Sequence, residues 1–212
     1  LAQDWASCGN ASVLNLTPFR QLSAPRQRQL LSAWMKGEDL YRPAFDMVQR
    51  LFDEVIESKV DAQAALHWNQ FYYVRYQQQL FRVSKAEYLA EQFQTIESIE
   101  QRFSLDQAYG FASGKFRIET QKYGLSSALL EQPLQIKPRL GGEKLHLYGR
   151  VGAWSLKKAI QSAQIFPWQR HTIQILSIDN VMLGVFTPKG FWLAQSEYCE
   201  VGGWQPKLIS SL

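Results

Sequence analysis

The spacing of apolar residues changes along this chain of 212 residues, and the change constrains its fold more than any other feature. Before residue 60, apolar side chains recur every three or four positions, which is typical of amphipathic helices. After residue 67 they gather in short runs separated by turn residues, which is typical of strands. The pattern predicts an α+β protein: a small, mainly helical domain with a hairpin, followed by a small antiparallel-sheet domain with one helix packed on it.

Two helices are predicted in the first part of the chain. Ser23 and Pro25 are helix-start signals and Gly37 is a stop signal, so a helix is expected over residues 24–36. A second helix is expected to begin at Pro43, where the missing N–H costs nothing. Its apolar stripe consists of Phe45, Val48, Leu51, Phe52, Val55 and Ile56.

The remainder is predicted mainly as strands. A hairpin is expected within 68–83, joined at 77–79, and composition favours a helix over 85–101. A further helix is expected after the N-cap Ser155, ended by Pro167. Strands are predicted over Phe116–Thr120, Leu134–Arg139, Leu145–Tyr148, Ile173–Ile178, Val181–Phe186 and Phe191–Leu193. Residues 1–16 lack a sustained period and are predicted to be a linker, followed by domains over 17–100 and 101–212.

Positive charge is concentrated in the second domain. Residues 1–130 carry 14 Lys+Arg and 14 Asp+Glu, whereas residues 131–212 carry 9 and 5. Within them, residues 137–170 hold seven basic residues and one acidic residue. This concentration favours a polyanion as partner, with a solvated basic face as the alternative.

Motifs for catalysis, metal binding and membrane insertion are missing from the sequence. It has no phosphate-binding loop, no dinucleotide fingerprint and no nucleophile elbow in a suitable context. The three His are isolated and the two Cys have no partner at metal-ligand spacing, so no metal site is predicted. The longest uncharged run, 5–19, is shorter and more polar than a membrane span of about 20 apolar residues. The expected location is the cytoplasm, with no membrane partner.

The basic segment has the residue types that bind structured RNA. Glycines let a backbone approach a phosphate, and cations beside a helix N-terminus favour an anion there. Duplex RNA is recognised through shape, phosphates and 2′-hydroxyls. Core packing is preferred over base stacking for Trp168, while phosphate contact and a salt bridge remain open for Arg170. The candidate RNA-binding residues are Arg139, Gly141, Gly142, Lys144, Arg150, Lys157, Lys158, Trp168 and Arg170.

Several short motifs occur in an order that is known from one family. Arg139-x-Gly141-Gly142-Glu143, Leu156-Lys157-Lys158 and Ile165-x-Pro167-Trp168-x-Arg170 resemble the C-terminal domain of bacterial tRNA(Ile)-lysidine synthetases. Arg26-Gln27 with Leu30-Leu31-x-x-Trp34, and the hairpin Tyr72–Tyr76 to Leu80–Val83, resemble the central domain of that family. The resemblance extends from about Leu14 to the end.

The resemblance implies a role in tRNA modification. Enzymes of this family use ATP and lysine to convert the wobble cytidine of an isoleucine tRNA into lysidine, and their catalytic domain carries an S-G-G-x-D-S loop. That loop does not occur here and the first residue is Leu, so the chain is expected to be the C-terminal half, inactive alone and without catalytic residues or a cofactor of its own. ATP and Mg²⁺ are expected for the full-length enzyme, which is a possible homodimer. The expected partner is isoleucine tRNA.

Two other functions are compatible with parts of the sequence. One is a self-contained enzyme of another class, which requires a nucleophile or carboxylate pair that the sequence does not reveal. The other is a protein-interaction module with no RNA role, which would use the amphipathic helix over 43–58 and the aromatic hairpin.

Overall fold

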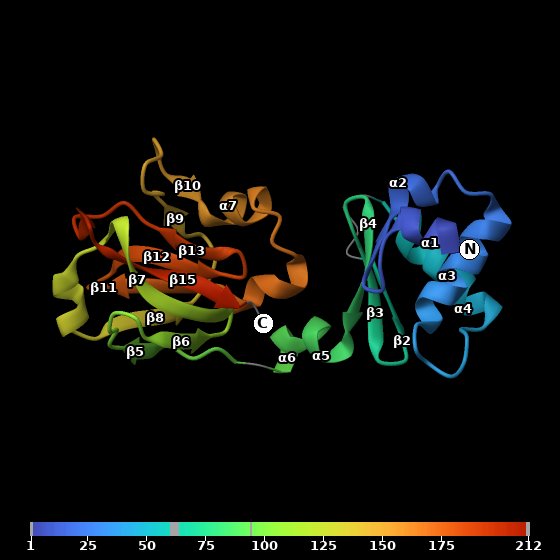
Figure 1. Cartoon of the computed structure of the whole chain (residues 1–212), viewed down its shortest axis with the longest axis horizontal. Helices are drawn as coiled ribbons and strands as arrows, with labels where there is room; N and C mark the ends of the chain where they lie inside the picture. Colours follow the sequence, from blue (N-terminus) through green and yellow to red (C-terminus); the bar gives the residue numbers. More distant parts are fainter. Residues whose placement is uncertain (1, 60–63, 94, 211–212) are drawn as a thin grey trace. The chain divides into compact units, whose positions relative to one another are not determined.

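The computed structural model describes residues 2–59, 64–93 and 95–210, and the chain divides into two compact units (Figure 1). Unit 1 is Leu1–Ala90 and unit 2 is Glu91–Leu212. The division falls inside the segment predicted as one helix over 85–101, and that prediction is wrong. The segment contains two short helices, α5 (Lys85–Tyr88) and α6 (Ala90–Phe93), and then strand β5 (Ile99–Gln101), which pairs with a strand of unit 2. The units therefore separate earlier than the expected boundary after residue 100.

Unit 1 combines helices with an antiparallel sheet. The sheet has the order β1-β4-β3-β2, formed by β1 (Val13–Asn15), β2 (Ala65–Trp68), β3 (Phe71–Tyr76) and β4 (Gln79–Ser84). The predicted hairpin is confirmed as β3 and β4, in which Tyr76 pairs with Gln79. The sheet is larger than the hairpin expected from the sequence, because β1 and β2 extend it on both sides. The helices are α1 (Ala2–Cys8), α2 (Leu16–Phe19), α3 (Ala24–Lys36), α4 (Phe45–Arg50), the π-helix η1 (Leu51–Ile56) and α5.

Residues 2–16 form ordered elements that contribute side chains to the core of unit 1, so the prediction of a linker is wrong for them. Cys8, Leu14 and Leu16 are all buried in the same apolar cluster as the residues of α3. The Asp4 carboxylate accepts hydrogen bonds from the Arg26 guanidinium at the start of α3. These residues escape a pattern search because each fills the core from a different short element.

The two predicted helices are present, with one difference. α3 has the predicted bounds and ends at Gly37, whose φ of 49° suits glycine. The second helix begins at Phe45 rather than at Pro43 and continues into η1. Its Val48, Leu51, Val55 and Ile56 are buried as the stripe predicts, whereas Phe45 is 70% exposed.

Unit 2 contains two main antiparallel sheets. A five-stranded sheet has the order β13-β12-β11-β8-β5, and a second sheet has the order β14-β7-β15 with β6 also paired to β7. A separate pair joins β9 (Lys144–Leu145) and β10 (Trp154–Ser155), beside which α7 (Leu156–Ser162) lies in Figure 1. The remaining strands are β6 (Ala108–Phe111), β7 (Gly114–Leu125), β8 (Leu134–Pro138), β11 (Gln174–Ile178), β12 (Val181–Thr187), β13 (Gly190–Leu193), β14 (Cys199–Val201) and β15 (Trp204–Ser210). The 3₁₀ helices are η2 (Ser127–Glu131) and η3 (Pro167–Thr172).

The middle of the five-stranded sheet is covered on both faces. In β12, Val185 belongs to the apolar cluster that contains residues of α7, whereas Leu183 and Phe186 belong to the cluster shared with β7 and β15. The register skips Leu183, since Gly184 pairs with Leu176 and Met182 with Ser177. Residues two positions apart in a regular strand share a face, so this bulge is what lets Leu183 and Val185 reach opposite buried faces. The class of mixed helix and antiparallel sheet is thus confirmed.

Candidate nucleic-acid interface

All nine candidate residues lie in one excursion of the chain. Residues 139–173, called the 139–173 excursion below, leave the five-stranded sheet after β8 and return to it at β11, although β8 and β11 pair directly. The excursion contains β9, β10, α7 and η3. It is anchored by Leu145, Leu156 and Ile160, which are buried against Val185 of the sheet. These few apolar residues therefore hold the basic segment against the five-stranded sheet.

The turn at the start of the excursion is organised by Glu143. One carboxylate oxygen, Oε1, accepts hydrogen bonds from the backbone N–H groups of Leu140 and Gly141, both at 2.7 Å. The other, Oε2, lies 3.7 Å from Nε of Arg139, an ion pair without a hydrogen bond. Arg139 therefore has a partner within the protein. If it also binds RNA, as predicted, the same guanidinium must serve both the ion pair with Glu143 and the RNA.

The two glycines of this turn lie at the surface. Gly141 and Gly142 have φ values of 99° and 84°, a region that other residues rarely adopt. A side chain built at either position meets no atom within 4 Å, so the surrounding space is open. The glycines are thus required by the backbone conformation, and the open space leaves their backbone accessible to a ligand.

Three lysines of the excursion are exposed beside one another in the fold. Lys144 pairs across β9 and β10 with Ser155, and α7 begins at the next residue with Lys157 and Lys158 in its first turn. The backbone N–H of Leu156 donates to the carbonyl of Glu143 at 2.9 Å and fixes this junction. Within residues 2–59, 64–93 and 95–210, none of the three ammonium groups forms an ion pair. These cations are available to a negatively charged ligand.

The start of α7 follows the prediction only in part. Ser155 occupies the predicted N-cap position, but its side chain makes no capping hydrogen bond. The helix has seven residues and ends at Ser162, before the predicted end at Pro167. Pro167 instead opens η3. We therefore attribute the anion-binding potential of this region to its lysine side chains and not to the end of a helix.

The last two candidates make contacts within unit 2. Trp168 is 6% exposed, and its ring stacks on that of Phe166 with centroids 4.9 Å apart. Nε of Arg170 donates a hydrogen bond to the carbonyl of Ile165 at 3.1 Å. Trp168 is therefore packed in the core, as its preferred interpretation expects, and its role in RNA binding stays a prediction. Arg170 shapes the chain between α7 and η3.

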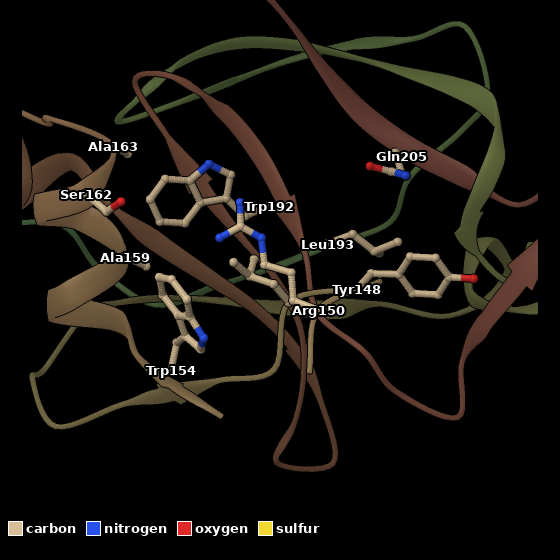
Figure 2. A pocket seen from close by; sticks show the side chains of 10 residues that line it. Tyr148, Arg150, Trp154, Ala159, Ser162, Ala163, Trp192, Leu193 and Gln205 are labelled. Atoms are coloured by element: carbon tan, nitrogen blue, oxygen red, sulfur yellow. The ribbon is translucent and has the colours of Figure 1, made fainter. Parts of the chain in front are cut away.

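Arg150 lies at a pocket that the sequence did not reveal. Its guanidinium carbon is 5.3 Å from the ring centroid of Trp154. Figure 2 shows these two side chains around one space with Trp192 of β13. The pocket has a volume of about 490 Å³. Its lining residues are Leu147, Tyr148, Arg150, Trp154, Ala159, Ser162, Ala163, Trp192, Leu193 and Gln205. The aromatic ones were missed because Phe191–Leu193 has the pattern of a core strand and Trp154 belongs to no motif.

The aromatic hairpin of unit 1 is largely occupied by contacts within that unit. Tyr73 is fully buried and donates a hydrogen bond from its hydroxyl to the carbonyl of Met35 at 3.2 Å. Burial raises the pKa of Tyr73 to about 12. Tyr72 stacks on Tyr88 with ring centroids 4.2 Å apart. These contacts occupy the rings of the hairpin, whereas Phe45 of the second helix stays exposed, as do Leu40 and Tyr41 before it.

Two further features are absent from the part of the chain that the structure describes. It has no cluster of three or more His, Cys, Asp or Glu side chains that could hold a metal ion. Within the same ranges, no helix is long and apolar enough to cross a membrane.

Comparison with known proteins identifies both halves of the chain. The TilS substrate binding domain matches residues 14–81, and the TilS substrate C-terminal domain matches residues 134–201. The second match includes all nine candidate residues. It also covers the 139–173 excursion and most strands of the five-stranded sheet.

Curated relatives share one name. A tRNA(Ile)-lysidine synthase of Acinetobacter baylyi is 61% identical over 214 aligned residues, which cover 100% of this chain and 46% of the relative. That of Xanthomonas campestris is 28% identical and covers 83% of this chain and 38% of the relative. The chain thus spans about half the length, or less, of these relatives. A solved structure of a TilS C-terminal domain aligns with a TM-score of 0.38 at 16% identity, over 54% of this chain and 100% of that structure.

Proposed function

Because the chain belongs to the tRNA(Ile)-lysidine synthase family, we propose that it is the part of such an enzyme that recognises tRNA. The longer relatives would join lysine to the wobble cytidine of an isoleucine tRNA, using ATP and Mg²⁺. The S-G-G-x-D-S loop of the catalytic domain does not occur in these 212 residues. We therefore assign binding, and not catalysis, to this chain.

The observation that carries the proposal is the group of free cations on the 139–173 excursion. Lys144, Lys157, Lys158 and Arg150 are exposed on one substructure, and no ion pair with another described residue neutralises them. Lysine and arginine side chains position a protein on RNA through its phosphates. An excursion that is anchored on a buried sheet holds these groups in a fixed arrangement, which reduces the entropy lost on binding.

The proposed mechanism uses contacts that lie away from the reacting base. Phosphate contacts made by this chain would hold the body of the tRNA while the wobble cytidine reaches a catalytic domain of the longer protein. Binding energy gained at such remote contacts is spent on orienting the reacting groups. The chain would thus contribute to the rate of modification without a catalytic residue of its own.

The direct test removes two of the free cations. Replacing Lys157→Ala and Lys158→Ala together is expected to weaken binding of isoleucine tRNA in a gel-shift titration. Each lost phosphate contact lowers the slope of log affinity against log salt by roughly 0.7 to 0.9, so the slope should fall by roughly 1.4 to 1.8.

A matched control changes the net charge equally at another surface of unit 2. Lys115 and Lys122 are exposed on β7, outside the excursion. Their double alanine variant is expected to keep the wild-type salt slope. If both double variants lose affinity equally, the binding responds only to net charge and the assigned interface is wrong. If wild-type protein does not bind tRNA at all, the proposed function fails.

The finer expectations are part of the same proposal. Preference for isoleucine tRNA over methionine tRNA can be tested by titrating both at two salt concentrations. If the chain recognises isoleucine tRNA specifically, the ratio of its affinities for the two tRNAs is kept at both salt concentrations. If binding is purely electrostatic, any difference between the two affinities is lost as salt rises. A cytoplasmic location and a homodimer of the full-length enzyme stay predictions.

A further inference from the structure

The pocket beside Arg150 has walls suited to a flat ring. The indoles of Trp154 and Trp192 come from β10 and β13, which are far apart in the sequence. Figure 2 shows the guanidinium of Arg150 next to the indole of Trp192, with the indole of Trp154 nearby. On the α7 side the wall consists of the small residues Ala159, Ser162 and Ala163. Trp154 is 36% exposed, so one of the two indoles remains accessible from solvent.

The chemistry of the walls favours a nucleobase. Aromatic faces and arginine planes stack on bases, and every base offers such a face. The Ser162 hydroxyl lies in the lining and can donate and accept a hydrogen bond, as the edges of bases require. The Gln205 amide also lies there; its nitrogen donates to the carbonyl of Tyr123, and its oxygen can accept from a base. The ten lining residues include one cation and no carboxylate, so a ligand attached to phosphates meets no repulsion.

The size of the pocket restricts what can enter. Its volume of about 490 Å³ falls in the range of roughly 300 to 1,000 Å³ that holds small ligands. A helical duplex is too wide for such a space, whereas one base with its sugar is of a suitable size. Trp154 of the pocket is also a neighbour of the free cations in the β9–β10 pair, because it pairs with Leu145, which follows Lys144, and precedes Lys157 by three residues.

We propose that this pocket binds one unstacked nucleobase from a single-stranded part of the bound RNA. The inference rests on the proposed function and adds to it a second mode of contact. The exposed lysines bind the backbone of structured RNA, and the pocket between Trp154, Trp192 and Arg150 binds a base that has left its stack.

The indole N–H signals of the seven tryptophans provide a direct readout by NMR. Adenosine 5′-monophosphate is expected to shift the signals of Trp154 and Trp192 in a saturable manner. Those of Trp34 and Trp204 should stay in place, because their N–H groups donate to the carbonyls of Asn10 and Ser126 inside the two units. Inorganic phosphate alone is expected to leave all these signals unchanged. The proposal is overturned if millimolar nucleotide causes no shift or if phosphate reproduces it.

A pair of variants tests the pocket with RNA. Trp154→Ala should weaken binding of a single-stranded tetra-adenylate roughly 5- to 150-fold, the range given by the loss of one base–aromatic stack. Binding of a blunt RNA duplex should stay at the wild-type level. Trp154→Phe should restore most of the affinity, because a ring is retained. Val151→Ala is the control, since Val151 is 99% exposed on the same loop and does not line the pocket.

The outcomes separate this inference from the function on which it rests. If Trp154→Ala binds the tetra-adenylate as wild type does, or weakens duplex binding equally, no base occupies the pocket. The lysine variants would still decide whether the chain binds tRNA. The Trp34 and Trp204 signals of each variant report on the fold, so a loss of affinity through unfolding is recognised directly.

Discussion

Two sets of cations in the same basic segment have different environments. Arg139 and Arg170 direct their guanidinium groups to Glu143 and to the carbonyl of Ile165. Lys157 and Lys158 are exposed and form no ion pair with any described residue. The comparison teaches that one basic segment contains two kinds of cation: some stabilise the local fold through internal contacts, and others are exposed and available to a ligand. Charge alone does not distinguish them, whereas the internal partners do.

The largest expected effect on stability concerns Trp168, a ring of the same segment that, like Arg139 and Arg170, makes contacts within the protein. Trp168→Ala should lower the free energy of unfolding by about 3 to 5 kcal/mol, because it removes a buried ring from the core. The measurement is urea unfolding followed by circular dichroism. Trp154→Ala is the matched control, with a smaller loss because Trp154 is 36% exposed. Equal losses would mean that the excursion stabilises the fold through both rings, and the comparison would break.

An intermediate effect is expected at the carboxylate that organises the turn. Glu143→Gln retains one oxygen acceptor but removes the charge that pairs with Arg139, and it should cost about 1 to 3 kcal/mol of unfolding free energy. The exposed Glu131→Gln of η2 should cost less than about 0.5 kcal/mol. Thermal unfolding of both variants provides the test. A Glu143→Gln protein as stable as wild type would show that the turn does not depend on this ion pair.

The smallest effect on stability is expected for the lysines. Lys157→Ala with Lys158→Ala should change the free energy of unfolding by no more than about 0.5 kcal/mol, because both side chains are solvated. The same urea titration measures it. A large loss of unfolding free energy would mean that the two lysines stabilise the fold, as Arg139 and Arg170 are expected to do. Weaker tRNA binding by this variant would then have a structural cause.

Helices with local signals were predicted well from the sequence. Helix α3 has its expected bounds because Pro25 and Gly37 restrict the backbone within the segment itself. The region after Lys85 shows the opposite. Ile99 is in a strand because it pairs with Ile136, a partner that no local pattern reveals.

The last strand, β15, was not predicted because its position in the sheet is also not visible in the sequence. Its Pro206 is a strand breaker, but β15 is an edge strand of its sheet, where a missing N–H is tolerated.

The interface was predictable as a segment but not as a surface. The concentration of charge over 137–170 is visible in the sequence, and it folds into one excursion. The sequence did not reveal that Arg139 would face Glu143, because that contact depends on a turn closed by two backbone hydrogen bonds. It also did not reveal the pocket, since Trp154 of β10 and Trp192 of β13 line one space only because the chain folds them to the same place.

The direct pairing of β8 with β11 separates the frame of unit 2 from the part proposed to hold RNA. Pro138 faces Gln174 across these strands, so the chain could pass between them by a short hairpin and keep every ladder bond of the sheet. Evolution can therefore lengthen, shorten or replace the segment between them without rebuilding the sheet. One condition limits such exchange: any replacement must bring apolar side chains to cover Val185 and Ala194, which the present segment shields from water.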